Sequence, residues 1–178
     1  MFAFYPDQKI IDKIGKFSKR EKNFKINNLE NFKKVGFPNK RFEDWKFIDF
    51  KDVISKNFKE LNFEIDNHKS EKIDLIKDFD HNYIFLINGK LDKFNFDYEE
   101  EKNIKIETYL NNDFVDKKER NPLVNLNNAF SRNGYHLRVK KGYKFKKILV
   151  IYHFFTENLD ENILNIKNNI KIEDNSET

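Results

Sequence analysis

The chain has 178 residues, enough for one domain or, as we prefer, for a helical lobe followed by one that contains a sheet. Hydrophobic residues make up 38% and charged residues 36%, but Phe alone occurs 20 times, which favours a folded core over disorder. With no Cys, the chain can form no disulfide and offers no thiolate ligand or cysteine nucleophile. The net charge of +4 is spread along the sequence and does not by itself indicate nucleic acid.

Three helices are predicted in the N-terminal part. Asp7 can cap an amphipathic helix whose apolar residues recur at helical spacing as far as Phe17. A second helix is predicted to begin at Asn27, with an acidic residue in capping-box position, and to stop at Gly36. Asp49 can cap a short third helix.

A hairpin is the clearest local signal in the sequence. The range 59–80 alternates weakly and is interpreted as a connector. In the hairpin, over 83–96, an apolar strand leads into Asn88-Gly89, the dipeptide that accepts the positive φ angles of a type I′ turn. A further short strand is predicted at 104–106.

A fourth helix and more strands follow. Asn121 and Pro122 form a helix start, and Asn133-Gly134 is expected to end that helix. Two strands are predicted within 135–155, separated by a turn at Gly142, and the second of them is the more apolar.

Histidine is the one residue type here that titrates near neutral pH, and it occurs at His68, His81, His136 and His153. None pairs with another at the spacing of a metal motif. We expect His136 to face solvent and His153 to lie in or beside the core with one hydrogen-bond partner. Structural roles are favoured, and a metal-dependent enzyme that uses these histidines and scattered carboxylates stays open as an alternative.

The sequence offers no catalytic constellation. Glu43 and Asp44 are adjacent, so their carboxylates point in different directions, and capping or ion pairs with Arg41 or Lys46 are the expected use. No Gly-x-Ser-x-Gly motif or Gly-rich phosphate loop occurs. Trp45 is interpreted as a packing residue. We therefore predict no catalytic, cofactor-binding or metal-binding residue in this stretch.

The segment from Arg132 to Lys147 is basic and contains no acid. Its charged residues are Arg132, Arg138, Lys140, Lys141, Lys144, Lys146 and Lys147, and its aromatic residues are Tyr135, Tyr143 and Phe145. Charge with interleaved aromatic rings is typical of a small nucleic-acid-binding module. We favour the alternative of a solvated strand face, because the aromatic residues follow the inward side of a strand pattern.

Two segments resemble a known family. The segment 36–47, Gly-Phe-Pro-Asn-Lys-Arg-Phe-Glu-Asp-Trp-Lys-Phe, is similar to the N-terminal signature of SufD proteins, within the SufB/SufD family of iron–sulfur cluster assembly scaffolds. The segment 121–134 resembles that family's Leu-Asn-x-Ala-Phe helix, which a Gly follows, and the Asn-Gly hairpin lies between the two. The positions that carry the resemblance are Gly36, Pro38, Glu43, Asp44, Trp45, Asn88, Gly89, Asn125, Ala129, Phe130, Gly134 and Gly142.

The resemblance implies an α+β chain in which helices and a small mixed or antiparallel sheet lead into a right-handed parallel β-helix. The expected regions are an N-terminal helical region over 1–58, the connector over 59–80, a mixed region over 81–156, and the start of the β-helix over 157–178. The family's cluster-related residues belong to later parts, so no cofactor is expected in this stretch.

The implied function is that of a scaffold subunit of the SUF complex that acts with SufB-like and SufC-like subunits and performs no chemistry of its own. We read the chain as a truncated N-terminal part, soluble and cytoplasmic, with no membrane partner and with nucleic acid as the less favoured alternative. An unfinished β-helix exposes a strand edge, so we expect the isolated piece to dimerise or aggregate.

Overall fold

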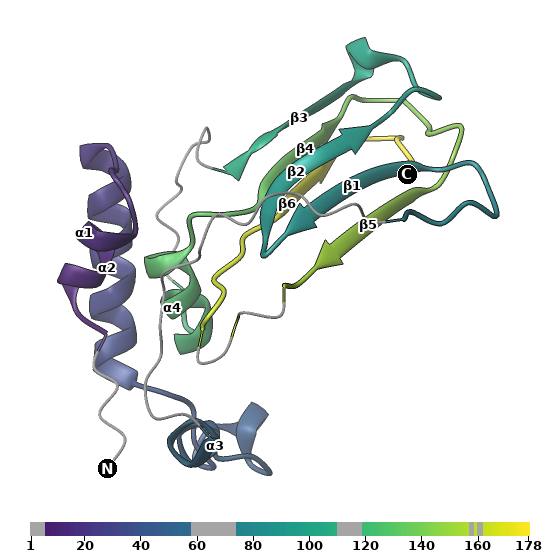
Figure 1. Ribbon diagram of the computed structural model, residues 1–178. Coiled ribbons are helices and arrows are strands. Elements are labelled where there is room, and N and C mark those ends of the chain that lie inside the picture. Colours follow the sequence, from purple (N-terminus) through teal and green to yellow (C-terminus); the bar gives the residue numbers. More distant parts are fainter. Residues whose placement is uncertain (1–5, 58–73, 110–118, 157–158, 160–161) are drawn as a thin grey trace. The chain divides into compact units, whose positions relative to one another are not determined.

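The chain forms two compact units (Figure 1). The computed structural model describes residues 6–57, 74–109, 119–156, 159 and 162–178. The helical unit contains the described residues of 1–64, 113–132 and 160–165. The β unit contains those of 65–112, 133–159 and 166–178. Most of the predicted connector lies outside the described residues, and its described part, 74–80, forms neither helix nor strand.

The helical unit contains four α-helices and a short 3-10 helix among its described residues. They are α1 (Gln8–Ile14), α2 (Lys19–Val35), η1 (Glu43–Trp45), α3 (Phe50–Asn57) and α4 (Pro122–Phe130). The predicted caps at Asp7 and Asp49 are confirmed, since their carboxylates accept hydrogen bonds from the backbone at Ile10 and Asp52. The fourth helix lies between strands in the chain yet packs against α2 in this unit.

The predicted start of the second helix at Asn27 is wrong. The helix begins at Lys19, because the Ser18 side chain accepts a hydrogen bond from the Glu21 amide. Ser18 and Glu21 have capping-box spacing. The sequence therefore contains a helix-start signal at Ser18, upstream of Asn27. The predicted end is confirmed, with Gly36 at a φ of 73°.

Buried polar groups accompany the apolar core of the helical unit. The core consists of Ile11, Ile14, Leu29, Phe32, Ile54, Leu126, Ala129 and Phe130. Lys25 is fully buried on α2, where its ammonium group donates to the Ser131 carbonyl and lies 4.6 Å from the centre of the Phe17 ring. Asn128 donates from α4 to the Asn28 side chain at 3.0 Å. These bonds fix α4 against α2 at polar as well as apolar contacts.

The β unit consists of two three-stranded sheets. Sheet 1 has the order β2-β1-β5 and sheet 2 the order β3-β4-β6. The elements are β1 (Asn82–Ile87), β2 (Lys90–Asn95), η2 (Glu101–Asn103), β3 (Ile104–Thr108), β4 (Tyr135–Val139), β5 (Leu149–Phe154) and β6 (Asn169–Ile172). The predicted α+β class and the antiparallel hairpin are both confirmed.

The two sheets share one apolar core. Ile84 and Leu86 of β1 pack with Tyr135, Leu137 and Val139 of β4, and flanking residues from β2, β3 and β5 surround them. Figure 1 shows β1 and β2 lying in front of the strands of sheet 2. Each sheet combines one antiparallel with one parallel pair, β1 being parallel to β5 and β4 to β6.

The parallel pairing of sheet 2 keeps one register over a long stretch. His136 pairs with Asn169 and Val139 with Ile172 in the strands, and bridges outside them join Asn133 to Ile166 and Lys144 to Glu177. The separation is the same each time, since 166 minus 133 and 177 minus 144 are both 33. Between the paired segments the chain passes through β5 in sheet 1. The chain therefore returns after one circuit and lies alongside its own earlier path.

Candidate functional site

The predicted residues of the 36–47 segment contribute packing and turns. The Pro38 side chain is buried, and its carbonyl accepts a hydrogen bond from the Phe50 amide at 3.2 Å. Trp45 packs edge-to-face on the Phe50 ring with centroids 5.4 Å apart, which joins η1 to α3. Glu43 and Asp44 are exposed, and neither forms an ion pair with a described residue. The expected ion pairs with Arg41 or Lys46 are thus not seen.

The signature residues of α4 support the helix and its packing. The Asn125 side chain donates to the backbone carbonyls of Glu119 and Asn121, both at 3.2 Å, and so holds the first turn. Ala129 and Phe130 lie in the core of the helical unit. The expectation that Asn133-Gly134 ends this helix is wrong, since it ends at Phe130.

Asn88 and Gly89 do more than form a turn. Their φ angles of 48° and 78° confirm the predicted positive-φ turn. The Asn88 amide nitrogen also donates to Thr156 Oγ1 at 2.9 Å, and its oxygen accepts from the Thr156 amide at 3.0 Å. A Cβ on Gly89 would lie 2.2 Å from Ile166 Cγ1. The turn is therefore fixed to both the segment after β5 and the segment before β6.

Gly134 lies where two passes of the chain come closest. A Cβ at this position would lie 2.0 Å from the Lys167 carbonyl oxygen, and the φ of Gly134 is 129°. The Lys167 amide donates to the Asn133 carbonyl at 3.0 Å beside it. Gly142 has a φ of 75° but open space around it, so it serves only the turn.

The histidines do not form a site. His81 is held on both sides, with Nε2 2.7 Å from the Tyr152 hydroxyl and Nδ1 2.9 Å from the Phe79 carbonyl. His68 lies outside the described residues. Within the described ranges, no three His, Asp or Glu side chains are grouped so that they could hold a metal ion.

The expectations for His136 and His153 are wrong. His136 is half-buried, stacks on Tyr109 at an interplanar angle of 5°, and its Nε2 has no hydrogen-bond partner among the described residues. Burial lowers its pKa, an effect that Glu107 opposes. His153 is exposed and stacks on Phe155. It pairs with Leu86 of β1 but, unlike Ile151 of the same strand, does not pack against the shared core.

One carboxylate that the sequence did not single out organises the long turn before β5. Glu99 accepts hydrogen bonds from Asn82 Nδ2, the Tyr143 hydroxyl and the amides of Lys146 and Lys147, at 2.8 to 3.1 Å. Burial alone would raise the pKa of Glu99, but these bonds together outweigh burial and lower it. The role is structural.

The aromatic residues of the basic segment face inward, as expected for a strand pattern. Tyr135 lies in the shared core of the two sheets, and Tyr143 and Phe145 pack against it. The Tyr143 hydroxyl donates to Glu99. These rings are therefore not available as platforms for stacked bases.

The cations of sheet 2 meet on its outward side. Cross-strand pairing places Lys105 of β3 opposite Arg138 of β4, and Arg138 opposite Lys171 of β6. Paired residues of neighbouring strands point to the same side of a sheet. We use the term basic face for this row with the three lysines beside it, namely Lys102, Lys105, Arg138, Lys140, Lys141 and Lys171. Half of these come from outside the segment that the sequence indicated.

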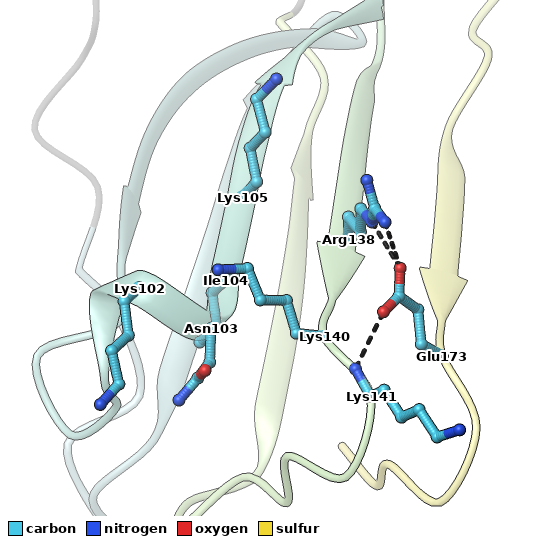
Figure 2. Close-up of a pocket in the computed structure, with 8 residues that line it drawn as sticks. All are labelled: Lys102, Asn103, Ile104, Lys105, Arg138, Lys140, Lys141 and Glu173. Carbon is cyan, nitrogen blue, oxygen red and sulfur yellow. Dashed lines mark hydrogen bonds and ion pairs between the residues drawn. The ribbon is translucent and has the colours of Figure 1, made fainter.

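All residues of the basic face except Lys171 line a hollow (Figure 2). The hollow has a volume of about 550 Å³, and its charged lining residues are Lys102, Lys105, Arg138, Lys140, Lys141 and Glu173. Glu173 accepts from Arg138 Nε at 2.6 Å and from the Lys141 amide at 2.9 Å, and these bonds lower its pKa. Both of its oxygens are therefore engaged by the chain itself.

A scan against models of protein families finds no match, and a search of curated proteins finds no significant one. None of the helices in the described part of the chain combines the length and the apolar character needed to span a membrane.

Proposed function

We propose that the chain is the N-terminal part of a SufD-like scaffold subunit of the SUF iron–sulfur cluster assembly complex, and that its β unit begins a right-handed parallel β-helix. The observation that carries this proposal is the constant register of sheet 2. In a parallel β-helix each residue pairs with the residue one coil later, so the offset is the coil length and does not change along the coil.

The path of the chain supports the same proposal. After β4 the chain crosses to β5 in sheet 1 and returns to β6 beside β4, so one circuit visits both sheets. Parallel strands joined by such a crossover are nearly always connected in the right-handed sense. The bridge from Lys144 to Glu177 extends the repeat into the turn.

Two signature glycines fit this proposal because each lies where the next pass of the chain approaches. Gly134 admits the Lys167 carbonyl and Gly89 admits the Ile166 side chain. At Gly134 the close neighbour is backbone, so any side chain there would separate the coils, whereas at Gly89 the close neighbour is the Ile166 side chain. The resemblance and the register therefore point to the same architecture through different residues.

The proposed role is structural. The helical unit and first coil would supply the entrance of a scaffold that acts with SufB-like and SufC-like subunits, while cluster chemistry belongs to other parts of the complex. The small nucleic-acid-binding module is the weaker alternative, because Tyr135, Tyr143 and Phe145 pack inward. The cations are considered separately below.

A co-purification experiment tests the proposal. The gene is tagged at its 5′ end in its own organism, with the downstream DNA left intact, and the product is compared with the chain that ends at Thr178. We expect the reading frame to continue into further coils and the longer product to retain SufB-like and SufC-like proteins. The shorter chain should not retain the SufC-like ATPase. A longer product that retains neither partner would overturn the proposal.

A further inference from the structure

A row of like charges crosses sheet 2. Lys105, Arg138 and Lys171 occupy three adjacent strands in one register line, and like charges directly opposite one another destabilise a sheet. Glu173 accepts a hydrogen bond from Arg138 and so offsets its charge. Glu107 Oε2 lies 3.0 Å from Lys105 Nζ. The ammonium groups of Lys140, Lys141 and Lys171 form no ion pair with a described residue. The face therefore has a cationic excess that its own acids do not balance.

The chain itself shows how a carboxylate is held on this face. Glu173 lies between the Arg138 guanidinium group and the Lys141 backbone N–H, an arrangement of charge-assisted hydrogen bonds. Figure 2 shows the Lys140 side chain extending across the hollow toward Ile104, away from Glu173. A second carboxylate in the hollow would thus meet lysines that Glu173 leaves available.

The dimensions and rim of the face favour a short anionic segment. Neighbouring strands are about 4.8 Å apart, so the row spans roughly 10 Å, which a few residues of extended chain can follow. The acids Glu100 and Glu107 lie at the rim, each beside a lysine of the face. These acids limit the continuous basic surface to a short stretch, whereas the long phosphate backbone of a nucleic acid needs a larger one. Of the aromatic rings in the basic segment, Tyr135 is buried, and Tyr143 and Phe145 are half-buried against the shared core.

We propose that the basic face is a docking site for a short acidic segment of a partner protein, whose Asp or Glu carboxylates bind over Lys105, Lys140, Lys141 and Lys171. Complementary charge between such surfaces sets specificity and the rate of association more than affinity, and the binding should weaken with salt. The inference does not depend on the proposed scaffold function.

Fluorescence anisotropy tests the site. The probe is a labelled peptide of alternating Glu and Ser, titrated with the purified chain at low and at physiological ionic strength. The test variant is Lys140→Gln, Lys141→Gln, Lys171→Gln. The matched control, Lys9→Gln, Lys34→Gln, Lys40→Gln, removes the same charge from exposed lysines of the helical unit. Far-UV circular dichroism of each variant checks that it is folded.

We expect the test variant to bind the peptide about tenfold more weakly, because it removes three of the cations that would pair with the peptide, and the control to change affinity less than about twofold. A peptide of alternating Lys and Ser should not bind. Equal losses in the two variants, or no binding of the acidic peptide, would overturn the proposal. Tighter binding of an oligothymidylate or a DNA duplex than of the peptide would also overturn it and assign the face to nucleic acid.

Discussion

Replacement of Gly134 by alanine is the sharpest test of the coil register. The added Cβ would lie 2.0 Å from the Lys167 carbonyl oxygen and 2.6 Å from its carbon. Real Cβ contacts stay beyond about 3 Å, so the two passes would have to separate by roughly 1 Å. That displacement stretches the bond from the Lys167 amide to the Asn133 carbonyl, now 3.0 Å, beyond hydrogen-bonding range.

The expected cost has three parts. Overpacking costs about 1 to 3 kcal/mol, the backbone strain of alanine at a φ of 129° about 1 to 3, and the lost hydrogen bond about 0.5 to 1.5. The sum of about 2.5 to 7.5 kcal/mol is a large part of the total stability of a typical domain. Gly142→Ala is the matched control, because Gly142 has a φ of 75° in the same unit but nothing within 4 Å of its Cβ position.

Urea unfolding followed by the sheet signal in circular dichroism measures the difference between the two variants. We expect Gly142→Ala to lose about 1 to 2 kcal/mol of unfolding free energy and Gly134→Ala to lose about 1.5 to 4.5 kcal/mol more, from overpacking and the lost hydrogen bond. Hydrogen exchange should also show lost protection of the Lys167 amide in Gly134→Ala alone. Variants within about 0.5 kcal/mol of each other, with that amide protected in both, would refute the close approach.

Two further substitutions test the connections within the β unit. Asn88→Gly keeps the positive φ but removes both bonds to Thr156, so urea unfolding should show a loss of about 1 to 3 kcal/mol, and an unchanged midpoint would contradict that role. The pKa of Glu99 is lower in the folded chain than in the unfolded chain. The ionised Glu99 carboxylate therefore stabilises the fold fully above the unfolded pKa of about 4.3, and this stabilisation is lost as pH falls through the folded pKa. Glu99→Gln should therefore be less stable at pH 7 but lose less stability on acidification, and parallel pH profiles of the urea midpoint would refute this.

Local chemistry made much of the fold predictable. Asp7 and Asp49 predict helix starts and Asn88-Gly89 predicts a hairpin. These predictions succeed because each interaction involves residues only a few positions apart. The start of α2 was misplaced although its own signal, Ser18 with Glu21, was present. The choice between two cap signals in one amphipathic stretch depends on which residues the core covers.

The parallel strand pairings could not be predicted from the local sequence pattern. Alternation shows that β1 and β4 are strands but says nothing of their partners, and β5 and β6 approach them only after long connections. The basic face depends on those pairings, since Lys105, Arg138 and Lys171 come from three separate segments. Local sequence indicates Gly134 only as a helix stop, because the Lys167 carbonyl that approaches it is distant in the sequence.

The environments of the histidines were wrongly predicted because they too depend on which strands pair. His153 lies on the same side of β5 as Ile151, which packs against the shared core, and yet His153 is exposed. Ile170 and Ile172 of β6 share the inward side with Leu137 and Val139 but remain 44% and 46% exposed. The inward sides of β5 and β6, one edge strand of each sheet, are thus incompletely covered.

Open edges with exposed apolar side chains favour pairing with another chain, so we expect the 178-residue chain to associate with itself. Light scattering after gel filtration should give a mass above the 21.7 kDa of one chain. Ile170→Lys with Ile172→Lys should restore the monomer, because lysine on an edge opposes pairing. The matched control is Val35→Lys with Val53→Lys on the helical unit, whose side chains are 46% and 43% exposed and should leave the association unchanged. A monodisperse monomer of the unmodified chain, or equal effects of the two double variants, would show that these edges are not what holds the copies together.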